Sequence, residues 1–143
     1  MIRGTTSQFR FKLPYSKENV KSAEVVFWQH GHNGINEDFP LPIVKKYNQY
    51  FSESGSIATS GPWNWINDNT LGVKLWQQET LTFSDRYKAY VQIRGTSIDG
   101  SVFASGQKPV VVYPIYADYP LEDEIIPPQN EDGFYVLDGE YIV

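Results

Sequence analysis

Three stretches of the chain alternate hydrophobic with polar residues, which is the pattern of a β-strand with one buried face. They are residues 7–13, 70–75 and 88–94. The side chains expected on the buried faces are Phe9, Phe11 and Leu13, then Leu71, Val73 and Leu75, then Ala89, Val91 and Ile93. Residues 23–30 have a continuous apolar centre, which predicts a strand covered on both faces.

Turn-forming residues separate these stretches. The intervening segments are predicted to be a loop at 31–42, a strand at 42–51, a long loop at 52–69, a short helical turn at 77–85, a tight turn at 97–100, and further strands within 101–106 and 108–116. Strands spaced about ten residues apart, without a 3.6-residue periodicity, predict an all-β fold. We expect an antiparallel immunoglobulin-like β-sandwich. The cysteines and core tryptophan of antibody domains are absent, so the prediction concerns architecture alone.

The composition changes at Ala117. Residues 117–143 contain eight of the 17 acidic residues and none of the 12 basic ones, which leaves 12 basic against nine acidic residues before them. Acidic residues mixed with proline are typical of an extended arm. The last residues, FYVL-DG-EYIV, predict a hairpin, because Asp-Gly favours a type I′ turn. We therefore expect a sandwich domain over residues 1–116 and an acidic, proline-containing arm over residues 117–143 that ends in a short strand or hairpin.

Composition also limits the classes of function. The chain has no cysteine, so disulfides, thiolate metal ligands and a cysteine nucleophile are excluded. No apolar run approaches the roughly 20 residues of a membrane helix, and the N-terminus lacks the apolar core of a signal peptide, so we expect a soluble, non-secreted protein. Basic residues are too sparse for a phosphate-binding stripe. We expect neither nucleic acid nor a membrane as a partner.

The two histidines form the candidate metal site. On a strand, His30 and His32 would point to the same side, with Asp38 or Glu37 nearby as a third ligand. The favoured interpretation is that both are polar residues at a strand end that leads into a Gly-Asn-Gly loop. The chain has no glycine-rich phosphate loop, GxSxG or HExxH motif, and the acidic run at residues 122–124 is typical of solvated charge. We expect no enzyme activity, no cofactor and no metal.

Three tryptophans are candidates for carbohydrate binding. Trp63 and Trp65 share a side if their segment is extended, and together with Trp28 they would offer an aromatic platform to sugar rings. The favoured interpretation is that these bulky side chains anchor a long loop against the sheet or a neighbouring subunit.

Several segments resemble a known group of proteins. They are MIRGTT, FRFKLP, AEVVFWQ, LWQQETLTFSD, YVQIRGTSIDGSVFAS and VVVYPIY. They are similar to small uncharacterised virion-associated structural proteins from the late gene clusters of tailed bacteriophages. The resemblance covers the first 116 residues, with departures between residues 31 and 69, and includes no catalytic signature. It implies a component of a phage particle.

The leading hypothesis is therefore a structural protein located in the virion. It would bind capsid, portal or tail subunits and further copies of itself, with the arm adding a strand to an exposed sheet edge of a neighbour. The predicted interface residues are Ile125, Ile126, Phe134, Tyr135, Val136, Leu137, Tyr141 and Ile142. The alternative is a carbohydrate-binding module that contacts host-surface glycan.

Overall fold

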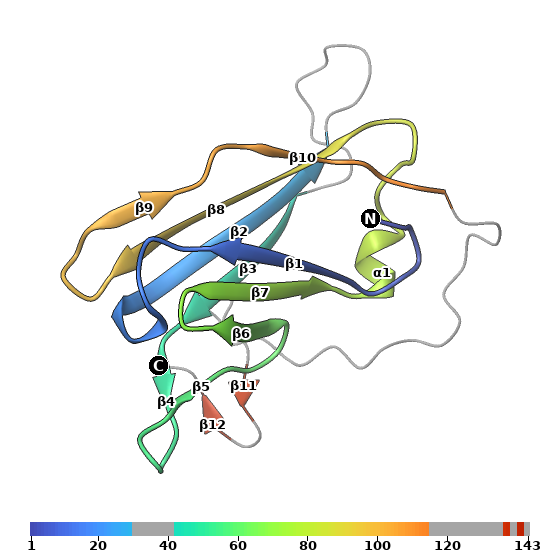
Figure 1. The fold of residues 1–143 in the computed structure, drawn as a ribbon. Coiled ribbons are helices and arrows are strands. Elements are labelled where there is room, and N and C mark those ends of the chain that lie inside the picture. Colours follow the sequence, from blue (N-terminus) through green and yellow to red (C-terminus); the bar gives the residue numbers. More distant parts are fainter. Residues whose placement is uncertain (30–41, 115–135, 138–139, 142–143) are drawn as a thin grey trace.

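The computed structural model describes residues 1–29 and 42–114, together with the backbone of residues 136–137 and 140–141. Nearly all of its regular structure consists of antiparallel strands (Figure 1). The prediction of an all-β fold is confirmed. In the described ranges the strands form two main sheets and two short hairpins.

The smaller main sheet has three strands in the order β1-β7-β6. These are β1 (Ser7–Lys12), β7 (Thr70–Leu75) and β6 (Trp63–Asn67). Phe9 lies opposite Val73 and Phe11 opposite Leu71, so the two predicted alternating stretches pair with their apolar residues on the same face. This agreement fixes the register, because a slip by one residue would turn every apolar side chain to solvent.

The larger main sheet is built around two long neighbouring strands, β2 (Val20–Gln29) and β8 (Ala89–Ser97). The strand β3 (Ile43–Asn48) pairs with the edge of β2 that faces away from β8. The strands β9 (Val102–Ala104) and β10 (Lys108–Val110) both pair with the other edge of β8, at successive positions along it.

Short elements complete the chain. A 3-10 turn (Lys17–Asn19) precedes β2, and α1 (Gln77–Thr80) follows β7, where a short helical turn was predicted. The strands β4 (Tyr50–Phe51) and β5 (Ile57–Ala58) form one hairpin. The strands β11 (Val136–Leu137) and β12 (Glu140–Tyr141) form the other, on either side of the predicted Asp-Gly turn.

The core lies between the two main sheets. Every second side chain of β1, β7 and β8 points into it, as the alternation predicted. The side chains of β2 also alternate between buried and partly exposed along most of its length. Phe9 of β1 packs on Phe27 of β2, with ring centroids 4.9 Å apart, which joins one sheet to the other. Its buried side chains include Phe27, Tyr47, Trp63, Leu71, Leu75, Trp76 and Phe83.

Two local predictions were wrong. Residues 52–69 are not one long loop, because they contain β5 and β6, and β6 pairs with β7 from Trp63 to Asn67. The alternation of Trp63 and Trp65 with Asn64 was a strand signal that the surrounding turn residues obscured. The strand predicted at residues 23–30 begins earlier, at Val20. Its outer side chains are half-buried rather than fully covered, so β2 carries no second layer on that face in the described residues.

Candidate functional site

The predicted metal site falls outside the described residues, since His30, His32, Glu37 and Asp38 belong to residues 30–41. Within residues 1–29 and 42–114, no group of three histidine or acidic side chains lies close enough together to hold a metal ion.

The three candidate tryptophans do not share a surface. Trp63 is only 4% exposed, and its indole N–H donates to the backbone oxygen of Lys46 at 2.8 Å. The indole N–H of Trp65 donates to the hydroxyl of Tyr47 at 3.0 Å. Trp28 lies on the outer face of the larger sheet and stacks on Tyr90, with ring centroids 5.8 Å apart. Trp63 and Trp65 therefore anchor β6 to β3 and cannot form a platform with Trp28.

The predicted interface residues lie mostly outside the described part of the chain. Ile125, Ile126, Phe134, Tyr135 and Ile142 belong to the undescribed ranges. Only the backbone is described for the other three, with Val136 opposite Tyr141, and Leu137 in the same two-residue strand.

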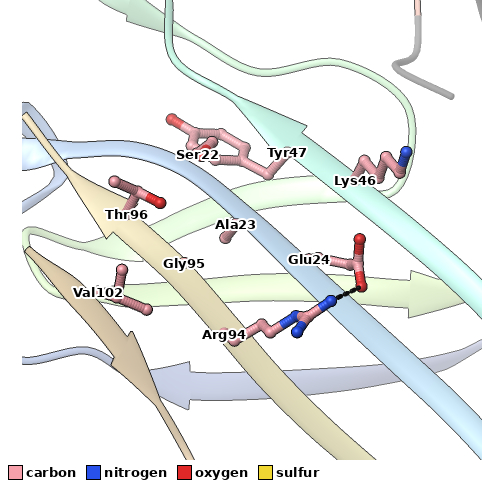
Figure 2. A pocket seen from close by; sticks show the side chains of 9 residues that line it. All are labelled: Ser22, Ala23, Glu24, Lys46, Tyr47, Arg94, Gly95, Thr96 and Val102. Carbon is pink, nitrogen blue, oxygen red and sulfur yellow. Dashed lines mark hydrogen bonds and ion pairs between the residues drawn. The ribbon is translucent and has the colours of Figure 1, made fainter. Parts of the chain in front are cut away.

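A shallow depression occupies the outer face of the larger sheet (Figure 2). It has a volume of about 390 Å3. The Arg94 guanidinium lies 3.3 Å from a carboxylate oxygen of Glu24 across its floor, and Val102 at one end is 76% exposed. An ion pair this accessible to water contributes little energy. The depression therefore offers an accessible surface with one ion pair on its floor.

A second hollow, which we call the β1 groove, lies between β1 and β10 and also measures about 390 Å3. Its apolar lining comprises Phe9, Phe11, Val91, Ile93, Pro109 and Val110. Three basic residues, Arg10, Lys12 and Lys108, also line it and are exposed. None of these three cations forms an ion pair in the part of the chain that the structure describes.

The β1 groove could not be located from the sequence. The alternation of Arg10 and Lys12 with Phe9 and Phe11 was visible and predicted one polar and one apolar side for the strand. Lys108 is almost a hundred residues away, and no local pattern says that its strand lies beside β1.

The sandwich also buries one lysine. Lys45 of β3 is 1% exposed, and its ammonium nitrogen lies 2.7 Å from both carboxylate oxygens of Glu79 in α1. The same nitrogen lies 4.3 Å from the centre of the Trp76 ring. Burial lowers the pKa of Lys45, and the charge of Glu79 acts in the opposite direction. Glu79 also accepts a hydrogen bond from the backbone N–H of Trp76. The same carboxylate therefore both caps the helix and binds the Lys45 ammonium.

The N-terminal segment MIRGTT and the segment LWQQETLTFSD contact one another. The Arg3 guanidinium donates to the backbone oxygens of Phe83 at 2.5 Å and of Leu81 at 3.0 Å. The Thr80 hydroxyl donates to the backbone oxygen of Thr5 at 2.8 Å. Gly4 has a φ of 74°, which a glycine adopts without strain. The residues of MIRGTT and LWQQETLTFSD thus hold these two parts of the fold together.

No protein-family model matches the chain, and no curated protein matches it. Among the described residues, no helix has both the length and the apolar character needed to cross a membrane.

Proposed function

We propose that this protein is a structural component of a tailed-bacteriophage particle and acts by adhesion to neighbouring subunits. The observation that carries the proposal is the open edge of β1, which no strand covers among the described residues and which borders the apolar β1 groove. Uncovered strand edges pair readily with other chains, and proteins that do not use them for binding usually protect them.

The resemblance in the N-terminal 116 residues supports the same proposal. Its segments supply the strands β1, β2 and β8 and the contact between Arg3 and the turn after α1. Residues with these roles stabilise the fold. A structural protein of a particle needs such a stable surface for its neighbouring subunits to bind.

We further propose that the sandwich is immunoglobulin-like. In variable-type immunoglobulin domains one sheet holds strands in the order A-B-E-D, and the other contains C′-C-F-G. The order β1-β7-β6 corresponds to B-E-D, and the order β3-β2-β8-β9 corresponds to C′-C-F-G. In this correspondence strand A would lie beside β1, where the described residues leave the edge open.

Adhesion is favoured over carbohydrate binding by the positions of the tryptophans. A sugar ring needs an accessible aromatic face, and burial removes Trp63 from any such role. Of the three candidates, Trp28 alone lies on the outer face of the larger sheet.

Membership of the particle is tested by quantitative mass spectrometry of purified virions of the phage that encodes this chain. We expect the protein in a fixed copy number, and its absence from intact particles would refute the proposal.

The role of the arm is tested by deleting residues 118–143. All buried hydrophobic side chains of the described residues lie between Leu13 and Val112, so we expect the shortened chain to fold. We expect it to enter particles less efficiently than the full chain when both are supplied together. The matched control is Glu18→Gln, an exposed charge change on the 3-10 turn, which should enter as the parent does. Equal incorporation of the shortened chain would show that the arm does not attach the protein.

A further inference from the structure

Among the described residues, the open edge of β1 has a defined set of backbone groups without a partner strand. The N–H of Leu13 donates to the oxygen of Asn69, just beyond the end of the β1–β7 ladder. Hydrogen-bonded and non-hydrogen-bonded pairs alternate along an antiparallel ladder. Residues 9, 11 and 13 therefore direct their backbone groups to β7, and Gln8, Arg10 and Lys12 direct theirs to the open side.

The side chains of this edge favour an occupant with alternating character. Those of Phe9 and Phe11 line the β1 groove and are only partly buried, so a strand added here would gain by placing apolar side chains against them. Those of Gln8, Arg10 and Lys12 are exposed. Because opposite charges directly across a strand pair are stabilising, the occupant should carry acidic residues beside Arg10 and Lys12.

The chain itself contains a segment of this kind. Residues 121–126 read LEDEII, in which Leu121, Asp123 and Ile125 share one side of an extended strand and Glu122, Glu124 and Ile126 share the other. This segment lies within the 27 C-terminal residues that hold eight acidic and no basic residues. An antiparallel register places Glu124 beside Arg10, Glu122 beside Lys12 and Ile126 beside Gln8. On the other side of the strand it places Ile125 beside Phe9, Asp123 beside Phe11 and Leu121 beside Leu13.

We propose that residues 121–126 of a second copy add as a strand to the open edge of β1, with Ile125 beside Phe9 in the β1 groove and Glu122 and Glu124 beside Lys12 and Arg10. This inference rests on the proposed function, because it identifies the segment and the surface by which neighbouring copies adhere. Such a strand supplies backbone partners for Gln8, Arg10 and Lys12, an apolar contact for Phe9 and carboxylates for the cations that line the groove. A nucleic acid would satisfy the cations alone.

Disulfide trapping tests the contact directly, because the chain has no cysteine of its own. Full-length Gln8→Cys and full-length Ile126→Cys proteins, one of them carrying a size tag, are mixed and mildly oxidised, and the heterodimer is followed on non-reducing gels. The matched control uses Asn64→Cys in place of Gln8→Cys. Asn64 is an exposed residue of β6, which forms the opposite edge of the same sheet. We expect the Gln8 pair to cross-link faster than the Asn64 pair by about tenfold or more, because docking raises the effective concentration of the thiols.

Charge exchange separates strand addition from random collision. Adding Arg10→Glu and Lys12→Glu to the Gln8→Cys protein should reduce its rate of cross-linking with Ile126→Cys to that of the Asn64→Cys control. Adding Glu122→Lys and Glu124→Lys to the partner should then restore it. Equal cross-linking rates for the Gln8 and Asn64 pairs would overturn the inference. Binding of single-stranded DNA is measured on the parent and on the Arg10→Glu, Lys12→Glu variant. If this variant loses DNA binding but cross-links as fast as before, the inference is also overturned. Such results would leave membership of the particle untouched, since mass spectrometry of virions measures it independently.

Discussion

Lys45 places an ammonium group inside the sandwich, where a charge is stable only with a close partner. Glu79 is that partner, and the Trp76 ring covers the same nitrogen. Because burial outweighs the attraction of Glu79, the pKa of Lys45 lies below its ordinary value of 10.5. The sequence predicted a strand around residue 45 but could not indicate the pairing, which joins β3 to a helix 34 residues further along the chain.

Replacing Glu79→Gln should lower the free energy of unfolding by about 3 kcal/mol, because it leaves a buried charge without its counterion. The amide oxygen of glutamine can still accept the Trp76 N–H, so the loss reports on the ion pair rather than on the helix cap. Urea unfolding at pH 7 measures the effect.

The control for that experiment is Glu24→Gln, which breaks the pair with the largely exposed Arg94 and should cost less than about 1 kcal/mol. Similar losses in the two variants would mean that burial does not strengthen the Lys45–Glu79 pair.

Tyr47 provides a pH-dependent prediction. Burial raises its pKa above the ordinary value of 10.0, and the hydrogen bond from Trp65 opposes that rise. The unfolded chain therefore ionises first, so the stability contributed by Tyr47 is complete below pH 10 and is lost as the pH rises through the folded pKa. Tyr47→Phe should be less stable than the parent by about 1 kcal/mol at pH 7, because the Trp65 N–H loses its acceptor.

The difference between parent and Tyr47→Phe should then shrink as the pH rises above 10. Urea titrations of both proteins at pH 7 and at several values above 10 test this, and Lys45 and the other tyrosines contribute equally to both. If the difference in stability stays constant across this range, ionisation of Tyr47 does not destabilise the folded protein.

At the scale of single elements, β8 depends on a glycine two residues before its C-terminal end. Gly95 lies opposite Ala23 of β2 and Phe103 of β9. A Cβ atom at this position would lie 2.5 Å from the backbone oxygen of Ser22 and 2.6 Å from Cζ of Phe103. The strand can therefore approach both neighbours only because this residue has no side chain.

Gly95→Ala should destabilise the protein by about 1–3 kcal/mol, since a backbone oxygen on one side and an aromatic ring on the other must move apart. Thermal or urea unfolding measures the change. Gly106→Ala is the matched control, because a Cβ atom there meets nothing within 4 Å, and it should leave stability nearly unchanged. If Gly95→Ala were as stable as Gly106→Ala, the close packing between β2, β8 and β9 would not restrict this position.

At the scale of the whole molecule, the N-terminal segment holds distant parts of the chain together. The Arg3 backbone N–H donates to the oxygen of Tyr113 at 3.1 Å, while its side chain binds the turn after α1. Gln29 makes a comparable connection from the end of β2, where its buried amide accepts from the N–H of Ser84 and donates to the backbone oxygens of Ser84 and Tyr87. The turn between β7 and β8 is thus attached to both the chain start and the larger sheet.

Alternation along the chain was sufficient to predict that β1, β7 and β8 are strands and which of their side chains are buried. The preference of apolar side chains for the interior acts on each strand locally, so the pattern survives in the sequence. The same reasoning failed at β6, where turn residues on both sides concealed a short strand.

Pairing between strands depends on how two complete sheets pack, which no local pattern records. The tertiary structure joins β1 to β7, about sixty residues away, and sets β2 in the opposite sheet. In the part of the chain that the structure describes, that choice leaves one edge of β1 open, and it brings Lys108 to the groove beside Arg10 and Lys12. It also encloses Lys45 beside Glu79 and places Trp63 and Trp65 against Tyr47. These long-range contacts form because burying both sheets together removes more apolar surface from water than either sheet could alone.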